Sequence, residues 1–224
     1  MTCRFFRWIT GLAGGCALLL VAVTGLSACG APQYTYSADY HDNAYFKVPY
    51  GWHPLTPAQV AKGLNGTPPA GVWTSAFEAG KVSPGDLGSF LANSPTVLSE
   101  VFKLNATASA GMSYNSLEDF FLPVTTNARQ VSAGSPSFSF TNFQLLDHQT
   151  LTPGQGVHGV RDIFQYTAQA LPGVKIVDTF DEVNLTNATD TQVYLLLVHC
   201  VDSCYAQNQK AINDVMTSFT VRSP

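Results

Sequence analysis

The segment TQVYLLLVHCV (191–201) places the strongest constraint on how this chain folds. Successive side chains of a β-strand point to opposite faces of a sheet. In this segment Leu195 and Leu197 would point one way, and Leu196 and Val198 the other. Because a strand that is apolar on both faces must be covered on both, the segment predicts a central strand between two layers.

Three further strand segments precede this one, at 139–151, 157–170 and 174–185. The connections between the four are short and rich in turn residues, most clearly at Pro172-Gly173. Short connections between neighbouring strands favour an antiparallel meander.

A helix is predicted over 202–219, because apolar side chains recur at helical spacing between Tyr205 and Phe219. Shorter helices are predicted at 56–64 and 115–122, where capping residues and prolines mark the ends. The fold class expected is therefore α+β, an antiparallel sheet flanked by helices on both faces in an α/β/α sandwich.

The first 28 residues have the three parts of an export signal: a positively charged start, an apolar stretch and small residues before a cleavage point. The sequence LSAC (26–29) resembles the lipobox of bacterial prolipoproteins, which implies cleavage before Cys29 and a diacylglyceryl thioether on its sulfur. A simple cleaved signal and an uncleaved membrane anchor are the alternatives. We expect residues 29–43 to form a flexible tether that holds the domain on the extracytoplasmic face of the cell membrane.

Charge excludes some partners. Residues 1–28 hold two of the eleven basic residues and none of the fifteen acidic ones, so the remaining 196 residues carry a net charge of −6. An acidic chain without a basic run is unsuited to binding nucleic acid or to electrostatic docking on anionic lipids. The chain also has no P-loop, dinucleotide fingerprint or G-x-S-x-G motif, and we expect neither a cofactor nor enzymatic activity.

The cluster His199, Cys200 and Cys204 is the most reactive set of side chains in the sequence. A disulfide between Cys200 and Cys204 is one interpretation, since exported thiol pairs usually oxidise. A zinc or copper site formed by all three residues is a second, because sulfur and nitrogen ligands suit both metals. A redox pair is a third, although the spacing is C-x₃-C and not C-x-x-C.

Acidic residues gather on the strand predicted at 174–185. Asp178 and Glu182 would share one face, and Asp181 would lie on the other. Two carboxylates four residues apart could act as acid and base in a hydrolase, or bind calcium. A solvated strand face near Lys175 is the plainer interpretation.

Two stretches are similar to PsbP-like domains. FKVPYGW (46–52) resembles the opening strand of that superfamily, and the stretch from Ile212 to Val221 resembles its closing helix and strand. The superfamily includes LpqN-type lipoproteins of actinobacteria and a eukaryotic Ran-binding import factor. The resemblance covers 44–221 and implies one domain that serves as a non-catalytic accessory or binding domain. This chain departs from the family pattern in its elaborated region at 80–135.

The function expected is that of a non-enzymatic, membrane-anchored envelope lipoprotein that binds a protein or an envelope component. Aromatic residues of the 80–143 region are the predicted partner surface, because large aromatics anchor interfaces. They are Phe90, Phe102, Phe120 and Phe121. The alternative is a metal or small-ligand binder that uses His199, Cys200 and Cys204, or a pocket between sheet and helix.

Overall fold

The computed structural model describes residues 32–81, 87, 92–135, 141–171 and 174–222. The predicted signal segment and Cys29 lie outside these residues. Within the described part of the chain, no helix is both long and apolar enough to cross a membrane.

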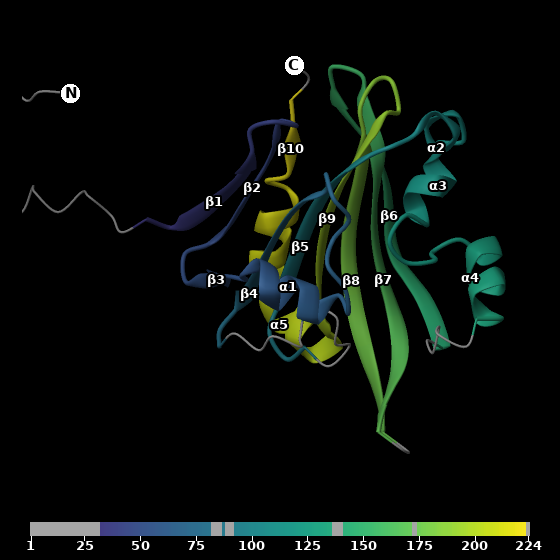
Figure 1. The fold of residues 1–224 in the computed structure, drawn as a ribbon. Helices are drawn as coiled ribbons and strands as arrows, with labels where there is room; N and C mark the ends of the chain where they lie inside the picture. The colour runs from purple at the N-terminus through teal and green to yellow at the C-terminus, as the bar shows by residue number, and fades with distance from the viewer. Residues whose placement is uncertain (1–31, 82–86, 88–91, 136–140, 172–173, 223–224) are drawn as a thin grey trace, which may run out of the picture. The chain divides into compact units, whose positions relative to one another are not determined.

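A seven-stranded sheet forms the centre of the domain (Figure 1). Every neighbouring pair in it is antiparallel. In spatial order its strands are β3 (Trp52–Pro54), β4 (Trp73–Ala79), β5 (Thr96–Lys103), β9 (Gln192–Val201), β8 (Val174–Thr186), β7 (Val157–Leu171) and β6 (Thr141–Gly154). The predicted meander is confirmed, because β6 to β9 are successive neighbours.

A second sheet of three strands consists of β1 (Tyr34–Asp39), β2 (Ala44–Pro49) and β10 (Thr220–Val221). It differs from the flexible tether expected over residues 29–43, because β1 pairs with the whole of β2. Pairing is favourable here because β2 buries Phe46 and Val48 on one side and offers β1 a complete row of backbone partners. The compact domain accordingly begins at Gln33 and not at residue 44.

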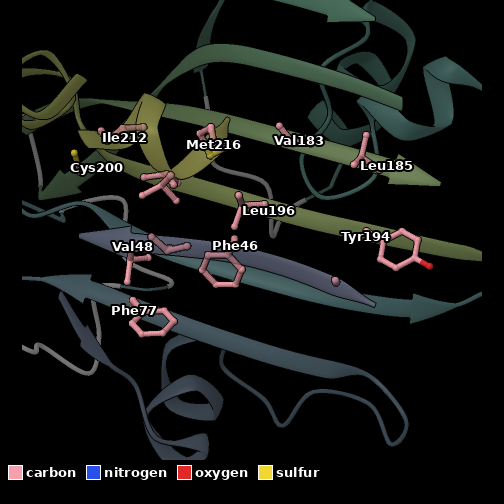
Figure 2. Packing of buried hydrophobic residues seen from close by; sticks show 14 of the residues in the cluster. Phe46, Val48, Phe77, Val183, Leu185, Tyr194, Leu196, Cys200, Ile212 and Met216 are labelled. Carbon is pink, nitrogen blue, oxygen red and sulfur yellow. The ribbon is translucent and has the colours of Figure 1, made fainter. Parts of the chain in front are cut away.

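One face of the large sheet is covered by helix α5 (Asp202–Met216) together with β2. Figure 2 shows the resulting core, in which Leu196 of β9 lies among side chains from α5, β2 and β8. Ile212 and Met216 of α5 are almost fully buried there, as helical spacing predicts.

The other face of the sheet packs against α1 (Pro57–Gly63) and α3 (Tyr114–Glu118). Thr56 caps α1 in a capping box with Gln59, which satisfies two backbone N–H groups at the helix start. Two further helices, α2 (Ala106–Ala110) and α4 (Thr126–Ala133), flank α3 in the sequence. Because helices cover both faces, the α/β/α class predicted from the sequence is confirmed.

A disulfide joins Cys200, the penultimate residue of β9, to Cys204 in the first turn of α5. The two Cα atoms lie 5.9 Å apart, which is ordinary disulfide geometry. The disulfide predicted from the sequence is confirmed, and it ties α5 to the central strand.

We predict that the double substitution Cys200→Ala with Cys204→Ala lowers the free energy of unfolding by about 2 kcal/mol, because the unfolded chain regains the entropy of a short closed loop. Urea unfolding of the two proteins without reductant measures this difference. The unsubstituted protein in reductant is the matched control and should lose the same amount. Equal urea midpoints for the variant and the oxidised protein would contradict the prediction.

Candidate functional site

The structure does not bring His199 together with the two cysteines. His199 lies on the face of β9 opposite to Cys200, and its ring nitrogens lie 3.1 Å from Asp178 and 3.2 Å from the carbonyl oxygen of Leu87. Both cysteine sulfurs are in the disulfide. Among the described residues, no group of three or more metal-ligating side chains is present. The predicted metal site is therefore not formed, because neighbouring residues of a strand point to opposite faces.

The carboxylates of β8 lie on the faces expected, but they are buried and not solvated. Asp178 and Asp181 are 0% exposed and Glu182 is 1% exposed. Asp178 faces His199, whereas Asp181 lies on the α5 side of the sheet and contacts Arg161. Because no substrate can reach Asp178 or Glu182, the structure does not support a hydrolase site that uses this pair.

Glu182 belongs to a polar row that crosses the sheet beneath α3. His148 of β6, Asp162 of β7 and Glu182 of β8 are consecutive partners in the strand register. The His148 Nδ1 atom lies 2.7 Å from Asp162 Oδ1. The side-chain amide of Asn184 donates hydrogen bonds to Glu182 Oε1 and to the carbonyl oxygen of Leu117 in α3. The row therefore attaches α3 to the sheet.

Burial controls the protonation of this row. Burial raises the pKa of Glu182 to about 8, and the hydrogen bond from Asn184 offsets part of that rise. Burial also raises the pKa of Asp162 to about 6, against the opposing hydrogen bond with His148. That same hydrogen bond raises the pKa of His148. The arrangement is thus most stable when Glu182 is protonated, as expected for a carboxyl group removed from water.

We predict that Glu182→Gln removes a large part of the pH dependence of stability. A carboxyl pKa raised from 4.5 to about 8 in the folded state stabilises the protein below pH 4.5. That stability is lost as the pH rises to about 8, by on the order of 4 kcal/mol. Urea unfolding at a series of pH values should show a shallower decline for the variant and a higher stability at pH 8. Asp214→Asn, which removes a half-buried carboxylate on α5, is the control and should retain the decline. An equally steep decline in the Glu182 variant would refute the prediction.

A second polar network lies on the α5 side of the sheet, around Arg161 of β7. The guanidinium donates to both carboxylate oxygens of Asp181, over 2.8 and 2.7 Å, and to Asn213 of α5 over 3.2 Å. The hydroxyl of Tyr205 donates to Asp181 over 3.0 Å. The Asp181 carboxylate raises the pKa of Arg161, so the guanidinium stays charged and its charge is neutralised locally.

A groove opens beside this network, between the end of α5 and the long β6–β7 hairpin. Its volume is about 350 Å³, the size of a small-molecule site. Buried or half-buried apolar side chains form its inner surface, and exposed polar ones its rim. The apolar residues are Leu151, Val183, Leu185, Met216 and Phe219, and the exposed polar residues are Gln149, Thr150, Thr152 and Thr217.

A second hollow, of about 330 Å³, lies on the other side of Arg161. It is lined by Ile163 of β7 and by Tyr205, Gln209 and Asn213 of α5. Arg161 borders both hollows. The Arg161–Asp181 ion pair therefore lies between two hollows that are both at the boundary between α5 and the sheet.

The predicted aromatic partner surface is only partly exposed. Phe102 and Phe120 are half-buried and pack edge to face, with ring centroids 5.0 Å apart. Phe121 is 36% exposed, and Phe90 lies outside the described residues. Phe102 and Phe120 contribute to the packing of α3 against the sheet, and Phe121 is the most exposed of the three members that the structure describes.

The sequence predicted a pocket between sheet and helix only as an alternative without named residues, and Arg161 was not among the predicted site residues. A usable signal was present, since Arg161 shares its face of the strand with Val157, Gly159 and Ile163, and these apolar positions favour a covered side of the sheet. Its partners Asp181 and Asn213 are 20 and 52 residues away in the chain. Their convergence depends on strand register and on the position of α5.

Neither protein-family models nor curated proteins match this chain. Solved structures do. Cyanobacterial PsbP (CyanoP) from Synechocystis sp. PCC 6803 matches with a TM-score of 0.49 and 14% identity, over 89% of this chain and 99% of that one. The Ran-binding protein Mog1p of Saccharomyces cerevisiae matches with a TM-score of 0.46 and 11% identity, over 84% and 95%.

LpqN of Mycobacterium tuberculosis, described as involved in cell envelope biogenesis, matches with a TM-score of 0.42 and 11% identity. This match covers 86% of the present chain and 93% of LpqN. PsbP, LpqN and a Ran-binding protein, the three groups named in the sequence resemblance, are thus among the similar structures.

Proposed function

We propose that this protein is a non-catalytic binding protein of the cell envelope that is held at the extracytoplasmic face of the membrane by a diacylglyceryl group on Cys29. Its ligand occupies the groove between α5 and the β6–β7 hairpin. One observation carries this proposal. The open groove of about 350 Å³ has an apolar inner surface and an uncharged polar rim.

The chemistry of the groove favours a neutral, amphipathic envelope component. Leu185 and Met216 offer apolar contact, whereas Thr152 and Gln149 offer hydrogen bonds at the rim. The one charged group at the groove, Arg161, already makes two hydrogen bonds to Asp181. A charged ligand would compete with this buried pair, and separating a buried ion pair costs several kcal/mol.

The environment of the acidic residues supports a non-catalytic role. A general acid or base must lie within hydrogen-bond reach of a substrate. Asp178 and Glu182 are enclosed by the sheet and its covering elements, and Asp181 is held by Arg161 and Tyr205. These contacts give the carboxylates structural partners in the folded domain.

The anchor rests on the sequence LSAC (26–29) after an apolar stretch. Two acyl chains bury enough CH₂ groups for stable attachment, at about 0.8 kcal/mol each. We predict that Cys29→Ser abolishes incorporation of an alkyne-tagged fatty acid and leaves residues 1–28 uncleaved, because the lipobox cysteine is lost. Ser27→Thr, which keeps the cysteine, is the control. A Cys29→Ser protein that still incorporates the tagged fatty acid would contradict lipid anchoring at Cys29.

For the groove, we predict that Thr152→Phe weakens binding of N-phenyl-1-naphthylamine, a neutral amphipathic fluorescent probe, by tenfold or more, about 1.4 kcal/mol. Thr152 is exposed at the rim, so a larger side chain there fills the groove without disturbing the core. Probe fluorescence on titration measures the affinity. Gln144→Phe, at an exposed position of the same strand outside the groove, is the matched control and should bind like the unsubstituted protein. Equal affinities for the two variants would show that the probe does not enter the groove.

A further inference from the structure

The three-stranded sheet turns an aromatic surface outward. Phe46 and Val48 of β2 point into the core, so the alternate residues of β2 and their partners on β1 point away from it. We call this surface the tyrosine face; it consists of Tyr34, Tyr36, Tyr40, Tyr45, Lys47 and Arg222. Figure 1 shows β1 and β2 on the side of the domain remote from α4.

Two tyrosines of this face are unusually exposed, and Tyr34 and Tyr45 are half-buried. Tyr36 is 76% exposed and Tyr40 is 82% exposed, the two highest values among the large apolar side chains of the described residues. Tyr50, at the end of the same hairpin, is 66% exposed. Several large exposed aromatics on one hairpin mark an interaction surface, because isolated ones are ordinary but contiguous ones are rare on a free monomer.

Two cations interleave with the rings. The Lys47 ammonium lies 4.0 Å from the centroid of the Tyr34 ring, and the Arg222 guanidinium lies 5.2 Å from that of Tyr45. Tyr40 packs edge to face on Tyr45, with ring centroids 6.0 Å apart. Tyrosine rings together with long cationic side chains are the residue types that settle at the interface between membrane and water.

The chain leading to β1 is short. Only four residues separate Cys29 from Tyr34. A fully extended chain spans at most about 3.6 Å per residue, so β1 begins within roughly 18 Å of a lipid attached at Cys29. A linker this short keeps the surface formed by β1 and β2 at a high effective concentration near the bilayer.

We propose that the tyrosine face lies on the headgroup region of the membrane in which Cys29 is anchored, an inference that rests on the lipid anchoring proposed above. The contact is made by the tyrosine rings, with Lys47 and Arg222 reaching the phosphate groups. Because the mature chain carries a net charge of −6, attraction to anionic lipid is not its basis, and docking takes place on neutral lipid too.

The test uses the full chain, lipidated and processed in cells and then reconstituted into phosphatidylcholine vesicles. Tyr36→Cys receives an environment-sensitive nitrobenzoxadiazole label. The label enters this position selectively, because Cys29 carries lipid and Cys200 is in the disulfide. Gln130→Cys, at an exposed position on α4, carries the same label as the matched control.

We expect the label at position 36 to show blue-shifted emission and to be quenched by phosphatidylcholine brominated near the headgroup, whereas the label at 130 emits as in water. Adding Tyr40→Ser and Lys47→Ser should reduce the blue shift at position 36. Both labels emitting as in water, on protein that floats with the vesicles, would overturn the docking while leaving the anchor intact. Protein that fails to float would overturn the anchor, and the docking with it.

Discussion

The burial of β9 on both faces is the constraint on which the rest of this structure depends. Leu195 and Leu197 pack in the cluster that includes α1, whereas Leu196 and Val198 pack against α5 and β2. A strand of this kind can lie only in the middle of a covered sheet, because exposing either face to water would forfeit its apolar burial. The disulfide then fixes where α5 starts with respect to this strand.

The large sheet also buries the carboxyl groups of Asp181 and Glu182, and their hydrogen-bond partners differ between its two faces. On the α5 side, Asp181 accepts hydrogen bonds from Arg161 and from the hydroxyl of Tyr205. On the α3 side, Glu182 faces an amide and no cation of its own, so its pKa rises to about 8. Burial without a neighbouring cation makes the neutral form of a carboxyl group more stable than the charged form. The first network borders the groove, and the second holds α3 in place.

The position of α5 also links the two proposed surfaces. The helix packs on β8, β9 and β2, and β6 extends beyond it. The groove lies where α5 stops short of the β6–β7 hairpin, and the tyrosine face lies on the far side of β2, turned away from the core. Ligand binding and membrane contact would therefore use different elements, so that one could take place without blocking the other.

The sequence by itself determined the fold class, the four-strand meander and the closing helix, because each depends on a local periodicity or on a short connection. It left the Cys200–Cys204 disulfide as one of three interpretations. It also placed Asp178 and Glu182 on one face of their strand. Whether those carboxylates met water, whether Arg161 met Asp181 and Asn213, and whether residues 34–39 formed a strand depended on which distant segments pack together. Only the tertiary structure decided these points, because burial and pairing are set by long-range contacts that no local pattern encodes.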